Sequence, residues 1–227
     1  IGKRQRGKKV SSTFRVYTRQ CSNYAFPKKV KRPFKDKKFR VFGNSKSNNK
    51  DKKTEELSNV SNNEELEEAE DDTKLSIDYQ RRQNKALNKL EKKSDKYLSM
   101  KGLKKYSPKM RKILENISKT KGLVLIYSNF RRMEGVGILS LALKANGYDE
   151  YGSDSNLPKF AIYSGTEDDK TKMKILNIFT DKSNRYGDRI KIIMTTSAGA
   201  EGLDLKNIRQ VHIMDPWYNS SRFEQII

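Results

Sequence analysis

The sequence is poor in cysteine and in apolar residues. Its single cysteine, Cys21, cannot form a disulfide within the chain, so a reducing, intracellular environment is expected. Hydrophobic residues make up 34% of the 227 residues, against a usual ~45–50%, so part of the chain is not expected to build a core. No apolar run approaches the ~20 residues that cross a bilayer, and the first residues do not resemble a signal peptide.

Basic residues greatly outnumber acidic ones, at 49 against 28, which gives a net charge of +21. The excess is local, because residues 1–43 hold 15 basic and 1 acidic residue, and residues 76–122 hold 15 and 4. Residues 44–75 hold 5 and 10, and residues 123–227 hold 14 and 13. The two basic stretches predict binding to a polyanion, with nucleic acid favoured, although a solvated basic surface is the alternative.

The first two parts of the chain differ sharply in composition. Residues 1–43 are expected to form a basic extension with a short strand at residues 14–20, where bulky and polar side chains alternate. Pro27 should end that strand. Residues 44–75 consist mainly of Asn, Ser, Glu and Lys and contain no aromatic residue, so they are interpreted as a disordered linker.

The rest of the chain is expected to be folded. Residues 76–122 are interpreted as a basic helical segment, in which Ser107 caps a helix that has Pro108 at its first position. In residues 123–227 apolar strands alternate with helices, which predicts an α/β domain with a parallel sheet and right-handed crossovers. The expected strands are residues 123–127, 160–163, 190–194 and 211–214, and the expected helices are residues 133–145 and 168–179.

Small polar residues follow three of the four expected strands. Ligands bind beyond the carboxyl ends of the strands in such sheets, and these residues let backbone N–H groups approach an oxyanion. A row of such ends suits a sugar–phosphate backbone, whereas any one of them could simply cap a helix. The residues are Ser128 and Asn129, Ser164 and Gly165, and Thr195, Thr196 and Ser197.

Several motifs stand in the order of one known family. Residues 195–205, Thr-Thr-Ser-Ala-Gly-Ala-Glu-Gly-Leu-Asp-Leu, resemble motif V of superfamily 2 helicases and SNF2-type translocases. Residues 123–130 resemble motif IV, and residues 211–219 resemble the next strand with its Asp-Pro-x-x-Asn end. Residues 222–227 resemble the opening of motif VI. Several motifs in the right order are specific, where one alone would be weak.

The resemblance extends to the large-DNA-virus branch of this family, the poxvirus-type early transcription factors and nucleoside triphosphatases. Residues 14–27, 106–110 and 127–136 are similar to that branch. The family implies a RecA-like parallel sheet flanked by helices. On the nucleic-acid side it implies phosphate contacts from Ser128, Ser164, Thr195 and Thr196, and their strand-end neighbours Asn129, Gly165 and Ser197 are candidates with them. On the ATP side it implies Gly202, Asp204 and Gln225.

Two elements of a complete ATPase are absent from the sequence. It has no Gly-x-x-x-x-Gly-Lys-Ser/Thr motif and no Asp-Glu pair at the end of an apolar strand to hold Mg²⁺. The chain is therefore interpreted as a piece of a longer protein, the C-terminal motor domain of a viral, transcription-linked helicase or translocase. ATP and Mg²⁺ would bind together with an N-terminal RecA-like domain. This chain alone holds no complete catalytic site and no metal ligand, and is not expected to hydrolyse ATP.

The expected partners follow from the same interpretation. They are a nucleic acid, with DNA favoured over RNA, the N-terminal RecA-like domain of the same protein, and a viral RNA polymerase. No membrane partner is expected, and a viral protein of this kind would lie in the virion or the host cytoplasm. The alternative is a non-catalytic nucleic-acid-binding subunit of a transcription factor that keeps the helicase-like fold.

Two further features have competing interpretations. Gly135 and Gly137 follow the first expected strand and suggest a dinucleotide-binding fingerprint, but Ser140 stands where its third glycine should be. A dehydrogenase or methyltransferase is thus disfavoured. His212 lies within an apolar strand, where a core or edge histidine is favoured over a ligand.

Overall fold

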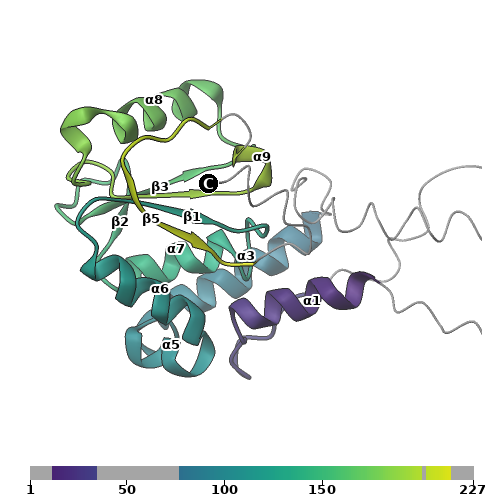
Figure 1. The fold of residues 1–227 in the computed structure, drawn as a ribbon. Helices are drawn as coiled ribbons and strands as arrows, with labels where there is room; N and C mark the ends of the chain where they lie inside the picture. Colours follow the sequence, from purple (N-terminus) through teal and green to yellow (C-terminus); the bar gives the residue numbers. More distant parts are fainter. Residues whose placement is uncertain (1–11, 35–76, 201–202, 216–227) are drawn as a thin grey trace, which may run out of the picture.

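The computed structural model describes residues 12–34, 77–200 and 203–215, and it contains a parallel sheet of five strands between helices (Figure 1). The strand order is β2-β3-β4-β1-β5, and every neighbouring pair is parallel. The predicted RecA-like α/β architecture is therefore confirmed. The strands are β1 (Leu123–Tyr127), β2 (Asp149–Glu150), β3 (Lys159–Tyr163), β4 (Ile192–Thr195) and β5 (Ile208–Ile213).

Helices cover both faces of the sheet. In Figure 1, α8 lies on one face, while α7, α6 and α3 lie on the other with α1 and α5 below them. The helices are α1 (Ser12–Asn23), α3 (Ile77–Glu91), α4 (Ser94–Tyr97), α5 (Met100–Tyr106), α6 (Pro108–Lys119), α7 (Val136–Ala145), α8 (Asp169–Thr180), α9 (Ser197–Ala200) and the 3-10 helix η3 (Lys182–Asn184).

Strand β1 is buried on both faces, as its continuous apolar run predicts. Val124 and Ile126 belong to a core cluster on the α7 side, and Leu123 and Leu125 belong to a second cluster on the α8 side. This alternation follows from the pleat, which points successive side chains to opposite faces. The sheet is thus held by two hydrophobic layers.

The basic segments share the core on the α7 side. Tyr24 and Val30 from the N-terminal segment are 1% and 2% exposed, and they belong to the same cluster as Leu90 of α3 and Met110 of α6. The Ser107 hydroxyl accepts a hydrogen bond from the Met110 N–H at 3.1 Å and so caps α6, which confirms that helix start. The segment 12–34 is therefore part of the packed unit and not a detachable basic arm.

The strand expected at residues 14–20 is wrong, because this segment lies within helix α1. The alternation of bulky and polar residues suggested a period of two. The structure instead buries Gln20 and Asn23, at 7% and 0% exposure, which stand three residues apart as a helix face requires. Both are polar, so a search for apolar periodicity could not find this face. The helix ends at Asn23, four residues before Pro27.

Helix α7 begins three residues later than expected, and two glycines explain why. A Cβ on Gly135 would lie 1.6 Å from the carbonyl oxygen of Phe130, and one on Gly137 would lie 1.8 Å from that of Arg132. The Val136 N–H donates to the Phe130 carbonyl at 2.8 Å. The two glycines thus allow a tightly folded loop before α7. This packing accounts for the Gly-x-Gly pattern without a dinucleotide.

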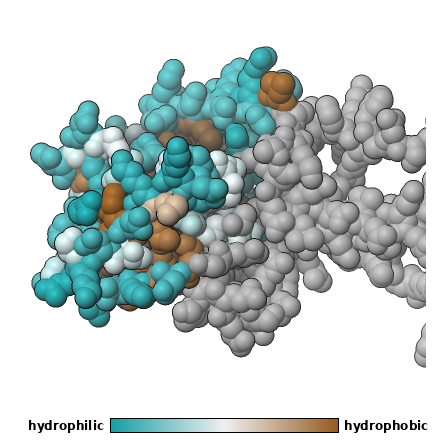
Figure 2. Space-filling view, turned by 90° about the horizontal axis from the view of Figure 1, so that it is seen from above, coloured by the Kyte–Doolittle hydropathy of each residue, from teal (hydrophilic) through white to brown (hydrophobic). Residues whose placement is uncertain are grey.

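The molecule seen from the α8 side is mainly hydrophilic, with a few hydrophobic groups (Figure 2). Large exposed apolar side chains in the described ranges include Leu157, Met173 and Val211. Among residues 12–34, 77–200 and 203–215, no helix has both the length and the apolar character needed to span a membrane.

Candidate functional site at the carboxyl ends of the strands

The carboxyl ends of four neighbouring strands lie side by side along one edge of the sheet. Strands β3, β4, β1 and β5 are consecutive in the strand order. Thr195 of β4 pairs with both Tyr163 of β3 and Tyr127 of β1, and Tyr127 also pairs with Ile213 of β5. The residues that follow these strands therefore form a row. All three polar strand ends predicted from the sequence lie in it.

The end of β4 is buried, and the Ser197 hydroxyl that follows it has no hydrogen-bond partner within the described residues. Thr195 and Thr196 are 0% and 2% exposed, and the Thr195 hydroxyl donates to the Thr196 carbonyl at 3.2 Å. The Oγ of Ser197 is also buried, and it has no hydrogen-bond partner among the residues that the structure describes. Buried hydroxyls are almost always satisfied, so the missing partner of Ser197 Oγ requires an explanation, and a bound group is one candidate.

Gly199 brings the short helix α9 against the edge. A Cβ at this position would lie 2.3 Å from the Tyr163 carbonyl oxygen and 2.8 Å from the Thr195 hydroxyl. Only a glycine permits this approach of α9 to the ends of β3 and β4. The sequence prediction named the residues before Gly199 but gave this glycine no separate role.

The end of β3 is built around a carboxylate. Ser164 is fully buried, and both its backbone N–H and its hydroxyl donate to Glu167, at 2.6 and 2.7 Å. Arg131 donates to the Ser164 hydroxyl at 2.8 Å and forms an ion pair with Glu167 at 3.0 Å. Burial raises the pKa of Glu167, but the hydrogen bonds from Ser164 and Arg131 outweigh it and hold this pKa below its ordinary value. Gly165 is exposed at this end.

The ends of β1 and β5 are joined by the buried carboxylate of Asp215, which is 1% exposed. Ser128 Oγ donates to its Oδ1 at 2.7 Å, and the Asn129 backbone N–H donates to its Oδ2 at 2.6 Å. From α1, Asn23 Nδ2 donates to Oδ1 at 3.2 Å, and Arg19 Nη2 lies 3.7 Å from Oδ2. Asp215 thus connects two strand ends with the N-terminal helix.

Ser128 and Asn129 are engaged inside the protein. They are 0% and 1% exposed. The Asn129 side chain donates to the Asp215 carbonyl at 2.8 Å and accepts from the Tyr127 hydroxyl at 2.9 Å. Their contact with phosphates stays a prediction, while the structure shows an internal role for both side chains.

Lys109 extends the Asp215 network to α6. Its Nζ donates to Asn23 Oδ1 at 2.6 Å, to the Met214 carbonyl at 2.9 Å and to Ser22 Oγ at 3.2 Å. Burial lowers the pKa of Lys109, and the nearby carboxylate of Asp215 partly offsets this effect. Sequence reasoning missed this lysine. It also missed Asp215 as a site residue, although Asp215 begins the quoted Asp-Pro-x-x-Asn pattern.

The residues predicted on the ATP side are only partly described. Gly202 and Gln225 lie outside the described residues. Asp204 has a side chain that is 82% exposed and lies 3.5 Å from Lys206 Nζ, a surface ion pair of small energetic effect. In the described part of the chain no three His, Cys, Asp or Glu side chains cluster where they could hold a metal. Asp204 is thus the one predicted ATP-side residue whose surroundings the structure describes, and its role toward a nucleotide stays a prediction.

His212 of β5 has the environment expected of a core or edge histidine. It is half-buried, and its Nε2 has no hydrogen-bond partner within the described residues. Burial lowers the pKa of His212, which favours the neutral ring at neutral pH.

A parallel α/β domain with a polar carboxyl edge is the general class that this geometry defines. Residues 108–227, more than half of the chain, match the sequence model of the helicase conserved C-terminal domain. The chain belongs to this family, as its motifs predicted.

Several of the similar proteins come from viruses. A protein of Acanthamoeba polyphaga mimivirus, named as an ATP-dependent RNA helicase, is 36% identical over 135 residues, which are 59% of this chain and 24% of that protein. A termination factor NPH-I homolog of African swine fever virus is 29% identical over 156 residues, covering 53% of this chain and 22% of that protein. The chain thus spans less than a quarter of the length of these two relatives.

One solved structure also aligns with the chain. It is the C-terminal domain of a SWI2/SNF2 ATPase of Sulfolobus solfataricus, at 18% identity and a TM-score of 0.38. The alignment covers 70% of this chain and 66% of that one.

Proposed function

We propose that this chain is the C-terminal motor domain of an ATP-dependent helicase or translocase, and that the carboxyl edge of its sheet holds the backbone of a nucleic acid. The observation that supports this proposal is the row formed by the ends of β3, β4, β1 and β5. A phosphodiester backbone presents repeated anionic groups, and consecutive strand ends can offer repeated backbone N–H and hydroxyl donors. Membership of the helicase family agrees with this use of the edge.

The residues of the edge divide into two groups. Gly165 is exposed, and the Ser197 hydroxyl has no partner within residues 12–34, 77–200 and 203–215, so these positions are the proposed contacts with phosphate. Ser128 and Asn129 bind Asp215 through their side chains, so they are proposed to position the edge. Thr195 and Thr196, buried and adjacent to Ser197, are proposed to offer backbone groups.

Ser197→Ala should weaken nucleic-acid binding without destabilising the fold. The Ser197 hydroxyl has no partner among the described residues, so its removal breaks no internal hydrogen bond recorded there. A hydrogen bond to a charged phosphate contributes about 1.5–3 kcal/mol, so we expect about a tenfold rise in Kd or more. Fluorescence anisotropy and urea unfolding would measure the two effects. Ser118→Ala, on the exposed face of α6, is the matched control.

Two results would refute this role of Ser197. One is binding by Ser197→Ala that equals binding by the wild-type chain. The other is a loss of binding that merely follows a loss of stability, because the hydroxyl would then be acting within the fold.

We further propose that ATP and Mg²⁺ bind between this domain and an N-terminal RecA-like domain of the same protein. Gly202, Asp204 and Gln225 would reach the nucleotide from this side. The exposure of the Asp204 carboxylate supports the assignment, because a side chain that is 82% exposed is accessible to a nucleotide. The P-loop and the Mg²⁺ ligands would come from the other domain.

Asp204→Ala should reduce the ATPase activity that nucleic acid stimulates in the intact protein. The carboxylate is exposed, so we expect little change in stability. A fall in turnover of about tenfold or more corresponds to about 1.4 kcal/mol of lost transition-state stabilisation. The exposed Asp188 lies before β4, away from the carboxyl edge, and Asp188→Ala is the control. Wild-type turnover in Asp204→Ala would contradict the assigned role. An intact protein without any stimulated turnover would support a non-catalytic scaffold instead.

The type of nucleic acid, the protein partner and the location are proposed from the names of the relatives. We propose DNA as the polymer and a viral RNA polymerase as a partner, because one relative is named as a termination factor. Another is named as an RNA helicase, so the ATPase assay should compare single-stranded DNA and RNA of one sequence. Stronger stimulation by RNA would overturn the choice of DNA. The viral relatives support an intracellular place, in the virion or the host cytoplasm.

A further inference from the structure

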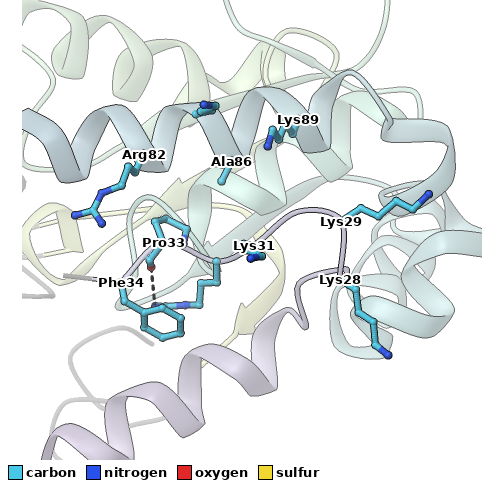
Figure 3. A pocket seen from close by; sticks show the side chains of 10 residues that line it. Lys28, Lys29, Lys31, Pro33, Phe34, Arg82, Ala86 and Lys89 are labelled. Atoms are coloured by element: carbon cyan, nitrogen blue, oxygen red, sulfur yellow. Dashed lines mark hydrogen bonds between the residues drawn. The ribbon is translucent and has the colours of Figure 1, made fainter. Parts of the chain in front are cut away.

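A strongly basic groove lies between α3 and the segment that follows α1 (Figure 3). It is a cavity of about 680 Å³, and seven of its ten lining residues are Lys or Arg. None of the ten is acidic. Arg32 pairs with Glu134 and Arg82 with Asp78, and the five lysines add further positive charge that favours an anionic ligand.

The cations form two opposing rows. On α3 they are Arg82, Lys85 and Lys89, whose spacings of three and four residues place them on one helical face. The segment 28–34 runs alongside this face. In Figure 3, Arg82 and Phe34 lie at one end of the groove, and Lys89 and the start of the segment lie at the other. A chain of phosphates lying along the groove would meet positive charge on both sides.

The segment 28–34 is held firmly in place. Val30 is 2% exposed and packs into the main core cluster. Arg32 forms an ion pair with Glu134, whose side chain is fully buried, and donates to Gln20 Oε1 at 2.5 Å and to the Pro33 carbonyl at 3.2 Å. The basic row is therefore preorganised and does not have to be ordered by a ligand.

The same ion pair places the groove next to the candidate edge. Glu134 belongs to the loop between β1 and α7, which begins at the carboxyl end of β1. Arg32 links that loop to the segment lining the groove. A nucleic-acid strand bound at the carboxyl edge near β1 could therefore continue into the groove.

Phe34 adds an aromatic surface to these charges. Its side chain is exposed to 56%, although most large apolar side chains of the molecule are buried. The Arg32 guanidinium lies 4.9 Å from the ring centroid and fixes the ring at the end of the groove. An exposed aromatic ring beside cations is the combination that binds single-stranded nucleic acid, where bases stack and phosphates pair with Lys and Arg.

We propose that this groove is a second nucleic-acid site, which holds a single strand beyond the carboxyl edge. Lys85 and Lys89, with the lysines of segment 28–34, contact its phosphates, and Phe34 stacks on a base. The volume of about 680 Å³ lies in the range of small-molecule pockets and suits a nucleotide or two of a single strand. The inference rests on the proposed function, because the same polymer occupies the edge and the groove.

The test measures binding of a labelled single-stranded oligonucleotide to the 227-residue chain at several salt concentrations. Lys85 and Lys89 are exposed, so the double variant K85Q/K89Q should fold normally. It should raise Kd about tenfold or more at low salt and reduce the slope of log K against log salt by about 0.7 for each lost contact. The matched control is K170Q/K174Q, two exposed lysines of α8 on the opposite face of the sheet. It should keep both the Kd and the slope.

Phe34→Ala separates stacking from charge. It should raise Kd about fivefold or more with the salt slope unchanged, because base stacking releases no counterions. Phe34→Trp should restore binding. A duplex of the same sequence should be insensitive to Phe34→Ala. Equal sensitivity of duplex and single strand would overturn the assignment to a single strand.

The outcome also distinguishes the groove from the edge. If K85Q/K89Q kept the wild-type Kd and the wild-type salt dependence, the proposal that the groove binds nucleic acid would be wrong. If Ser197→Ala weakened binding at the same time, the proposed function of the edge would stand alone. A chain that bound no oligonucleotide at any salt would overturn both.

Discussion

Gly135→Ala should lower the free energy of unfolding by about 4 kcal/mol or more, the range of the most severe single substitutions. The new Cβ would lie 1.6 Å from the Phe130 carbonyl oxygen and 2.5 Å from its carbon. Both are backbone atoms, so no side-chain rotation can relieve the overlap. The loop would have to open, and the hydrogen bond from Val136 N–H to the Phe130 carbonyl would be lost. Urea unfolding followed by circular dichroism would measure the change.

Gly147→Ala is the matched comparison. Gly147 has a φ of +88°, but no atom lies within 4 Å of the position that its Cβ would take. Alanine there should cost only the strain of a left-handed backbone, about 1–2 kcal/mol. A Gly135→Ala variant no less stable than Gly147→Ala would contradict the close approach of the loop to Phe130.

The sequence predicts the sheet well because the decisive signal is local. The apolar runs of β1, β3, β4 and β5 were all located, with shifts of up to three residues at their ends. Strand β2 was missed because it has only two residues, Asp149 and Glu150, and no apolar run. Helix α1 was mistaken for a strand because its buried face carries the polar Gln20 and Asn23. Whether a polar side chain is buried depends on its hydrogen-bond partners elsewhere in the chain, so local periodicity does not predict it.

The candidate site also depends on contacts between residues that are far apart in the sequence. The strand ends were located, since each follows a recognisable strand, but the partners of these ends were not. Asn23 and Asp215 are 192 positions apart and bond at 3.2 Å. Lys109 reaches the Met214 carbonyl across 105 positions. Periodicity and motif spacing describe neighbours along the chain. They predicted that Ser128 and Asn129 face a phosphate, but they could not show that both residues bind Asp215.

Asp215→Ala should lower the free energy of unfolding by about 3–5 kcal/mol, because it removes one member of a buried, charged network. The carboxylate accepts hydrogen bonds from Ser128, Asn129 and Asn23, and it lies 3.7 Å from Arg19. Without it these buried donors lose an acceptor, and Arg19 loses a nearby carboxylate. Asp215→Asn retains one acceptor oxygen in the same volume, so its cost should be smaller. Urea unfolding of the two variants at neutral pH would compare them.

The network also predicts that substitutions at Asp215 and in α1 have coupled effects on stability. Asn23→Ala removes a donor to Asp215 and the acceptor of Lys109 Nζ, so alone it should destabilise the chain. In the double variant with Asp215→Ala the losses should not add, since each single change already breaks the shared bond. We expect a coupling of at least about 0.5 kcal/mol. Strict additivity would mean that the bond between Asn23 and Asp215 adds no stability of its own. A measured coupling would show that the Asp215 network holds helix α1 to the end of β5.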